Sequence, residues 1–333
     1  MPPVEIPGSS LGDELRIALA AVLDGLPPRR AAQAVERLIA NYRGRTPTDA
    51  PVLRDRSDVA AYAAYRMPAT FAAVRAALAA FRARAGQWSP SQHLDIGGGT
   101  GAATWAVADA WPGDGFATTV LDWSEAALDL GRTLASDAPH PVLRAAQWRR
   151  HSLGAPLTLP AADLITISYV LSELDTADGA SVIAEAARTA QAVVVVEPGT
   201  PAGYRRVLRA RQQLIDAGLT VLAPCPRADT CPVQGEDWCH FAARVNRSSL
   251  HRQVKGGSLP YEDEKFSYVA ALRGDATPAP GRVVRHPQIR KGQVLLDLCL
   301  PEGDLQRTIV TKRHGELYRA ARDAAWGDRW PPA

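Results

Sequence analysis

The sequence predicts an α/β fold in which a parallel sheet follows a helical region and precedes a small β-rich module. Three observations predict it. Short apolar runs alternate with helix-like segments, a glycine-rich turn follows the first of these runs, and a Pro-rich, Cys-containing stretch ends the alternation. Alternating strands and helices favour a parallel sheet. We therefore expect a helical N-terminal region (1–90), a Rossmann-like domain (91–222) and a cysteine-rich basic C-terminal module (223–333).

The N-terminal region has the apolar periodicity of helices. Residues 9–43 are expected to form two helices separated by Pro27-Pro28, and residues 57–85 another helical segment. We expect an interruption at Met67-Pro68, because proline lacks the N–H that a helix interior needs.

The central region is predicted to form five strands. The expected strands are 93–96, 117–121, part of 142–148, 163–171 and 192–199, with helices over 179–189 and 204–219. Four consecutive valines in the fifth strand favour a strand that is covered on both faces.

Glycines and two acidic residues mark one rim of this sheet. Asp95 is followed by Gly97, Gly99 and Gly101, and the second apolar run ends in Asp122, 21 residues after Gly101. Glycines let a backbone approach a ligand closely, and an acid at the end of the second strand can accept hydrogen bonds from ribose hydroxyls. A glycine-rich turn without a ligand is the alternative.

The spacing discriminates between nucleotide cofactors. A dinucleotide fingerprint requires Gly-x-Gly-x-x-Gly, which disfavours NAD or FAD. The pattern here, Asp-x-Gly-x-Gly-x-Gly, resembles the first motifs of S-adenosylmethionine-dependent methyltransferases. This resemblance implies that Asp95, Gly97, Gly99, Gly101 and Asp122 bind S-adenosylmethionine. Residues 168–173 lack the Pro-Pro motif of amino-methyltransferases, which argues against adenine-N6 chemistry.

The four cysteines suggest a metal site. Cys225, Cys231 and Cys239 share one loop, and Cys299 follows 60 residues later. Three clustered thiolates and a remote one are typical of iron-sulfur proteins. Zinc is the alternative, although tetrathiolate zinc prefers Cys pairs two to four residues apart, and this sequence has none. Four unrelated buried cysteines are the third interpretation.

Composition excludes some classes of protein. The chain has 333 residues, of which 46% are hydrophobic, but no apolar run long enough to span a membrane. The first residues resemble neither a signal nor a transit peptide, and Arg and Ala are abundant while Lys is scarce. We therefore expect a cytoplasmic, bacterial protein whose cysteines are not structural disulfides. The oligomeric state is not determined, and a monomer is the simpler expectation.

The net charge of +3 is unevenly distributed. Residues 201–333 hold 21 Lys and Arg against 14 Asp and Glu, or +7, which leaves −4 for residues 1–200. The C-terminal part is therefore the better candidate to face a polyanion.

The cysteine region also carries a more specific resemblance. The pattern includes the segments 224–226, 231–232, 237–241, 247–255, 259–269 and 299–303, together with 65–68 near the start and 326–328 near the end. These segments resemble the methyltransferase-like proteins of the mitochondrial small ribosomal subunit and their bacterial relatives. The resemblance covers about residues 60–330.

That resemblance implies a fold, two cofactors and a partner. It implies a methyltransferase-like domain that binds S-adenosylmethionine, a [4Fe-4S] cluster on Cys225, Cys231, Cys239 and Cys299, and a role on the small ribosomal subunit and its 16S-type rRNA. The role is either rRNA methylation or assembly, so enzymatic activity stays open and no catalytic residue is assigned. The alternatives are a non-catalytic rRNA-binding scaffold with the same fold and a zinc-containing small-molecule methyltransferase.

The basic residues then have an expected purpose. Folding around one cluster would bring two groups onto a phosphate-binding surface: Arg244, Arg247, His251, Arg252 and Lys255, and Arg282, Arg285, Arg290 and Lys291. The alternative is an ordinary solvated surface. We expect the acidic run at 261–264 to be a turn whose carboxylates pair with these arginines.

Overall fold

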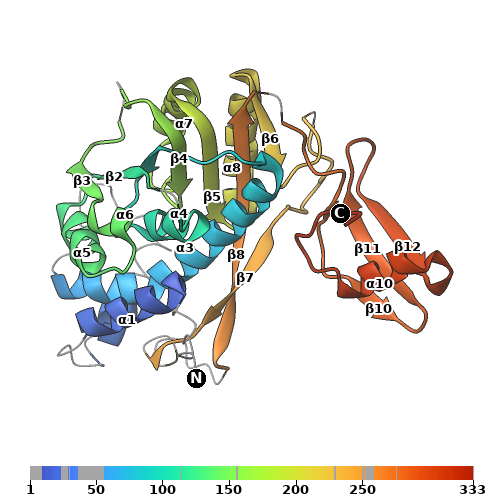
Figure 1. Cartoon of the computed structure of the whole chain (residues 1–333), viewed down its shortest axis with the longest axis horizontal. Helices are drawn as coiled ribbons and strands as arrows, with labels where there is room; N and C mark the ends of the chain where they lie inside the picture. Colours follow the sequence, from blue (N-terminus) through green and yellow to red (C-terminus); the bar gives the residue numbers. More distant parts are fainter. Residues whose placement is uncertain are drawn as a thin grey trace, which may run out of the picture.

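The computed structural model describes residues 10–23, 29, 31–36, 56–113, 115–154, 157–228, 230–249, 252, 259–274 and 276–332. Two long helices, α1 (Leu11–Leu23) and α3 (Arg56–Ala85), lie across one side of the molecule (Figure 1). In the described part of the chain, no helix combines the length and the apolar character needed to cross a membrane.

The predicted interruption at Met67-Pro68 is wrong, because helix α3 continues through Pro68 without ending. Proline removes one backbone hydrogen bond from a helix interior. Tertiary packing compensates, since Met67 and Ala69 on either side of Pro68 are at most 2% exposed.

The main sheet has eight strands in the order β3-β2-β1-β4-β5-β8-β6, and β7 pairs with β8. Their bounds are β1 Gln92–Ile96, β2 Ala117–Asp122, β3 Gln147–Arg150, β4 Ala162–Ser168, β5 Ala190–Pro198, β6 Leu219–Ala223, β7 Phe241–Asn246 and β8 Tyr261–Arg273. The five strands β1 to β5 are all parallel, and they lie side by side in the order 3-2-1-4-5 of a doubly wound sheet. The predicted Rossmann-like α/β fold is therefore confirmed.

Strands β7 and β8 belong to the main sheet, although residues after 223 were expected to form a separate module. The turn predicted at 261–264 is wrong, because these residues form the first part of β8, a 13-residue strand. Strand β8 lies antiparallel between β5 and β6. The chain thus returns to the Rossmann-like sheet after the cysteine loop, because the apolar half of β8 is buried there.

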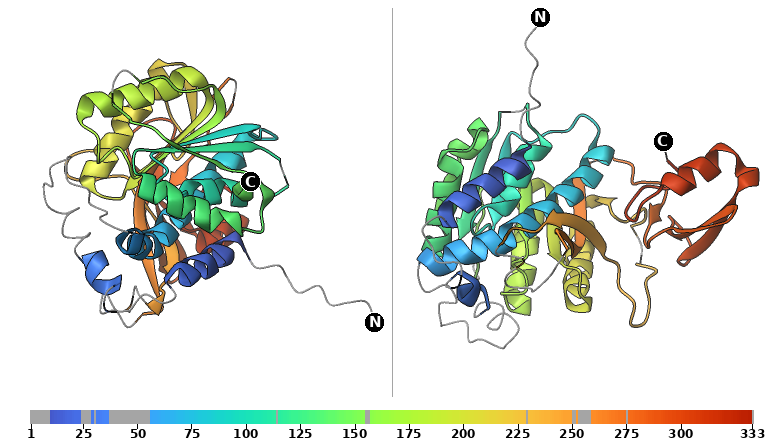
Figure 2. Two further views of the ribbon diagram at one scale, coloured as in Figure 1. Left: turned by 90° about the vertical axis from the view of Figure 1, so that its left-hand side faces the viewer. Right: turned by 90° about the horizontal axis from the view of Figure 1, so that it is seen from below.

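Helices cover both faces of this sheet (Figure 2). Their bounds are α4 Ala102–Ala110, α5 Glu125–Ser136, α6 Pro141–Arg144, α7 Thr176–Thr189 and α8 Pro201–Asp216. Val194 and Val196 of β5 join the core under α3 and α4, whereas Val193 and Val195 join the core under α7 and α8. The valine run is therefore covered on both faces, as predicted.

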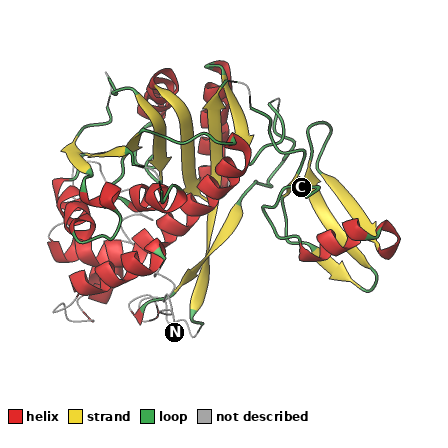
Figure 3. Ribbon diagram, in the orientation of Figure 1, coloured by secondary structure: helices red, strands yellow, loops and turns green. Residues whose placement is uncertain are grey.

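The C-terminal module projects from the main domain (Figures 1 and 3). It contains β9 Arg282–Val283, β10 Gln288–Arg290, β11 Gln293–Cys299, β12 Gln306–Thr311, the 3-10 helix η1 Lys312–His314 and α10 Glu316–Asp323. These strands form a separate antiparallel sheet with its own small core, which includes Leu296 and Val310.

Candidate cofactor and metal sites

The glycine loop between β1 and α4 depends on the absence of side chains. Gly97, Gly99 and Gly101 have φ values of 62°, 53° and 85°, a region that L-residues with side chains rarely adopt. A Cβ at Gly97 would lie 2.4 Å from Cγ2 of Val170, and one at Gly101 would lie 2.5 Å from the Trp148 ring. At Gly99 the nearest atom would be an Asp122 oxygen at 3.8 Å, so the loop is open there.

Asp122 connects this loop to the end of β2. Its Oδ2 accepts a hydrogen bond from the Gly99 N–H at 2.9 Å, and its Oδ1 accepts one from the Ser124 N–H at 2.8 Å. Burial raises the pKa of Asp122. The carboxylate also interacts with the Trp123 N–H, so of about four acceptor positions one remains for a hydroxyl group of a ligand. The loop and Asp122 therefore fit a ribose-containing cofactor, and their role in binding stays a prediction.

Asp95 lies deeper than a residue that faces a ligand. It is fully buried, and it accepts hydrogen bonds from the Thr104 N–H at 3.2 Å, the Thr104 hydroxyl at 3.0 Å and the Thr166 hydroxyl at 2.8 Å. Burial raises the pKa of Asp95 to about 6. These contacts join the start of α4 to β4, so Asp95 fixes the position of the loop.

Next to the loop, three residues from distant segments meet at the end of β4. The Tyr169 hydroxyl donates to Oε1 of Glu264 at 3.0 Å, and Arg66 on α3 donates to the same oxygen at 3.1 Å. Tyr169 has a φ of 59°, although it is not glycine. Spacing alone gave no signal for this trio, because each member comes from a different part of the chain.

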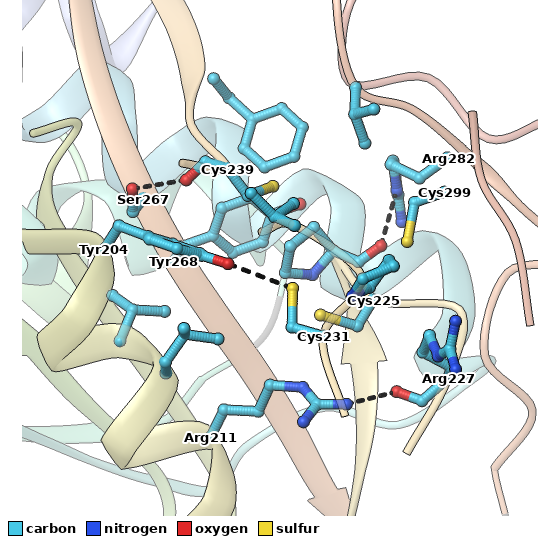
Figure 4. A pocket seen from close by; sticks show the side chains of 17 residues that line it. Tyr204, Arg211, Cys225, Arg227, Cys231, Cys239, Ser267, Tyr268, Arg282 and Cys299 are labelled. Carbon is cyan, nitrogen blue, oxygen red and sulfur yellow. Dashed lines mark hydrogen bonds between the residues drawn. The ribbon is translucent and has the colours of Figure 1, made fainter. Parts of the chain in front are cut away.

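All four cysteines line one cavity between the main domain and the C-terminal module (Figure 4). Cys225, Cys231 and Cys239 come from the loop between β6 and β7, and Cys299 comes from the end of β11. The cavity, part of which is open to solvent, has an empty volume of about 580 Å³. The tertiary structure thus brings the remote cysteine to the other three.

The thiols lie in surroundings that oppose their ionisation. Burial and the neighbouring Cys225 and Cys231 raise the pKa of Cys299 to about 12. Burial and the other three thiols raise the pKa of Cys239 well above its usual value. Four thiolates placed this close require a compensating positive charge, which a bound metal centre supplies. The donor set therefore fits a thiolate-bound metal centre.

The spacing of these groups does not match a single ion. Among the residues that the structure describes, no three His, Cys, Asp or Glu side chains form a group that could hold one metal ion. The structure therefore shows four thiols that line one cavity.

Three further residues around the cavity were not found from the sequence. The Tyr204 hydroxyl lies 3.2 Å from the Cys231 sulfur. Two buried arginines border the thiols: Arg211 donates to the Arg227 carbonyl at 2.7 Å, and Arg282 donates to the Pro224 carbonyl at 3.0 Å. They hold the cysteine loop against α8 and the C-terminal module.

The two basic groups expected to bind phosphate are largely engaged within the protein. Arg244 pairs with Asp263 at 2.9 Å and Arg247 with Glu262 at 3.4 Å, as expected for the acidic run. Arg285 pairs with Asp237, and Arg282 is buried. Arg290 and Lys291 are exposed, whereas His251 and Lys255 lie outside the described residues.

Fold and site together define a methyltransferase-like α/β protein with an additional cysteine-lined junction. A model of the family described as mitochondrial small ribosomal subunit Rsm22 matches residues 56–331, so the chain belongs to the Rsm22 family. This range includes both candidate sites.

Two curated relatives extend this finding. The human mitochondrial ribosome assembly protein METTL17 is 31% identical over 292 residues, which cover 81% of this chain and 62% of that protein. The Saccharomyces cerevisiae mitochondrial ribosome assembly protein RSM22 is 22% identical over 243 residues, which cover 42% of this chain and 39% of that protein. The matched region thus spans less than two thirds of either relative.

Solved structures give more distant matches. An O-methyltransferase family protein from Burkholderia thailandensis is 14% identical with a TM-score of 0.43, over 78% of this chain and 72% of that one. A putative RNA methyltransferase from Pyrococcus horikoshii is 14% identical with a TM-score of 0.41, over 72% of this chain and 96% of that one. Neither match bears on what this chain binds.

Proposed function

We propose that this protein is an assembly factor of the small ribosomal subunit that binds 16S-type rRNA, S-adenosylmethionine and a [4Fe-4S] cluster. The observation that carries the proposal is the family match over residues 56–331, which includes both the glycine loop and the cysteine cavity. The relatives METTL17 and RSM22 are described as ribosome assembly proteins. The cytoplasm is the proposed compartment.

The cofactor part of the proposal is supported by the glycine loop. Gly99 borders open space, and Asp122 beside it keeps an acceptor position for a ribose hydroxyl. When bound, S-adenosylmethionine would bring an activated methyl group to this rim. Asp122 and the loop would orient the adenosyl part, while Asp95 would keep the loop in place.

The cluster part is supported by the thiols. Cys225, Cys231, Cys239 and Cys299 would be the ligands, and the bound cluster would supply the positive charge that stabilises their thiolates. Each thiolate of such a cluster binds a different iron, so the four sulfurs stay farther apart than around one zinc ion. The support for the cluster is that all four thiols line one cavity.

An assembly role is favoured over rRNA methylation because the relatives METTL17 and RSM22 are both described as ribosome assembly proteins. In the trio beside the loop, Tyr169 and Arg66 both donate to Glu264, and these contacts tie β8 and α3 to the end of β4. Methyl transfer to rRNA in a reconstituted assay, lost in the Asp122→Ala variant, would contradict the non-catalytic role.

Two measurements on full-length protein purified without oxygen test the cofactors. Iron and inorganic sulfide in equal amounts are expected, whereas stoichiometric zinc without iron would show the zinc alternative. Calorimetry should detect S-adenosylmethionine binding that weakens about tenfold or more in Asp122→Ala, since a hydrogen bond to a charged group is lost. No binding heat at millimolar ligand would reject the cofactor.

RNA recovery tests the partner. Crosslinking of the protein in cells, followed by sequencing of the bound RNA, should enrich 16S-type rRNA over other RNAs. Equal recovery of all abundant RNAs would reject the proposed partner.

A further inference from the structure

The outer end of the C-terminal module gathers exposed basic residues from two separate turns. Arg290 and Lys291 lie where β10 turns into β11, and Lys312 and Arg313 lie directly after β12. All four are exposed. We call this set the basic end.

The two turns are held side by side. Gln293 of β11 pairs with Thr311 of β12, and the Lys312 N–H donates to the Gly292 carbonyl at 3.2 Å. Neighbouring strands lie about 5 Å apart, so the four cations form one patch. Gly292 has a φ of 79°, which allows the tight turn that places Lys291 on the outside.

The basic end lies away from the main domain. Strand β11 has seven residues, of which the last, Cys299, lines the cysteine cavity, and this length separates its two ends by about 20 Å. Helix α10 runs in the same direction as β11, from the basic end toward the main domain. Just after its C-terminal end, Trp326 contacts His240 and Phe241. The 3-10 helix η1, which precedes α10, therefore lies at the end of the module away from the main domain.

These four cations have no carboxylate partner among the described residues, unlike four arginines elsewhere in the C-terminal half. Arg244, Arg247, Arg285 and Arg307 each pair with a carboxylate. Within the described ranges, no ion pair involves Arg290, Lys291, Lys312 or Arg313; Arg290 donates only to the neutral Gln288 side chain at 3.3 Å. A charge that no carboxylate neutralises is available to an external anion.

We propose that the basic end binds the sugar-phosphate backbone of RNA. This inference rests on the proposed function and names the surface that contacts the RNA. Clustered Lys and Arg neutralise phosphates and release counterions, and this contact does not read sequence. The side chains of Gln288 and Gln293 flank the patch, and their amide groups can donate to sugar and phosphate oxygens.

The test is a salt series of RNA binding by the full chain. The probe is a fluorescent fragment of 16S-type rRNA, followed by anisotropy. The variant Lys291→Glu, Lys312→Glu, Arg313→Glu should weaken binding more than about tenfold near 0.15 M salt and should reduce the slope of log K against log salt by about 3, or about 1 per phosphate contact. Replacing the same residues by Gln should act in the same direction but less.

A matched control makes the same change of charge elsewhere. Arg149→Glu, Arg205→Glu, Arg209→Glu alters three exposed arginines of the main domain and should leave the slope unchanged. Melting temperatures of both variants close to that of the wild type would exclude unfolding. This is expected because, in the described part of the chain, only Arg149 among the six altered residues has a side-chain contact, to Gln147 two residues away.

Three results would overturn the inference. Wild-type protein that fails to bind the RNA would reject the proposed function and the basic end with it. Wild-type binding with an unchanged slope in the triple Glu variant would reject the basic end alone. Loss of binding to subunit precursors or to anionic lipid vesicles, with naked RNA binding intact, would assign the basic end to a protein or a membrane instead.

Discussion

The glycine loop and the cysteine cavity differ in how far apart in sequence their residues lie. Asp95, Gly99 and Asp122 come from one strand-helix-strand unit, in which Gly99 donates to Asp122 and Asp95 accepts from Thr104. Cys225 and Cys299 come from a loop and a separate module. Burial and the neighbouring thiols raise the pKa of both, while nearby arginines, among them Arg211, oppose this rise. The residues of the first site hold each other in place, whereas we propose that a bound metal centre completes the second.

The largest expected effect is the loss of a cysteine ligand. Cys299→Ser should abolish iron and sulfide binding and lower the melting temperature by more than any other variant described below, because binding of a metal centre contributes directly to folding free energy. Iron analysis and thermal unfolding, both without oxygen, measure this. Arg285→Ala is the control: it breaks a partly exposed ion pair across the same junction, worth at most about 1 kcal/mol, and should retain iron. Full iron content in Cys299→Ser would contradict the four-cysteine site.

Glu264 makes contacts beside the glycine loop although it comes from a distant part of the chain. Glu264→Gln leaves the mostly buried Arg66 without its counter-charge and should reduce the free energy of unfolding by about 2–4 kcal/mol. Asp263→Asn, one residue earlier in the same strand, breaks an exposed pair with Arg244 and should cost less than about 1 kcal/mol. Denaturant unfolding of both variants provides the comparison. Equal losses of unfolding free energy in the two variants would mean that the trio of Arg66, Tyr169 and Glu264 does not hold α3 and β8 to the end of β4.

Two glycines with nearly the same φ separate backbone strain from packing. Gly97→Ala should cost about 2–5 kcal/mol, because its φ of 62° disfavours a side chain and its Cβ would meet Val170 at 2.4 Å. Gly86→Ala, with a φ of 63° and open surroundings, should cost only about 1–2 kcal/mol. The double variant Gly97→Ala, Val170→Ala removes the contacts with the two γ carbons but leaves the two Cβ atoms 2.7 Å apart, so it should recover only part of the loss. A Gly97→Ala protein as stable as Gly86→Ala would show that the loop is not tightly packed.

The smallest effect concerns pH. Burial lowers the pKa of His93 to about 3 from 6.5, so between these values the unfolded chain binds one more proton and stability falls as pH falls. Burial raises the pKa of Asp95 to about 6 from 3.8, which acts with the opposite sign, since here the folded chain binds the extra proton. The two nearly cancel between about pH 4 and 6.

Asp95→Asn should therefore reveal the His93 dependence. Its stability should decrease by up to about 1.4 kcal/mol per pH unit as the pH falls from 6 to 4, relative to the wild type. Urea unfolding at several pH values measures this, and a His93→Gln, Asp95→Asn double variant should lose the added slope. If the curves of stability against pH for Asp95→Asn and the wild type are parallel, His93 and Asp95 do not make opposite contributions.

Local sequence patterns determined much of this protein. The alternation of apolar runs predicted the parallel strands, and the glycines before Ala102 predicted a tight turn between a strand and a helix, because these signals depend on neighbours within a few residues. The cysteine spacing identified Cys225, Cys231, Cys239 and Cys299 as one group, and the tertiary structure brings them to one cavity.

Only the tertiary structure decided the contacts between distant segments. No local signal could place β8 between β5 and β6, keep α3 helical through Pro68, or bring Arg66 to Glu264, 198 residues away. The same holds for the basic residues: their number is a property of the sequence, but pairing of Arg244 with Asp263 and isolation of Lys312 depend on which strands become neighbours. Burial and long-range pairing are set by the whole fold, and for this reason they determined which predicted residues support the structure and which remain available for binding.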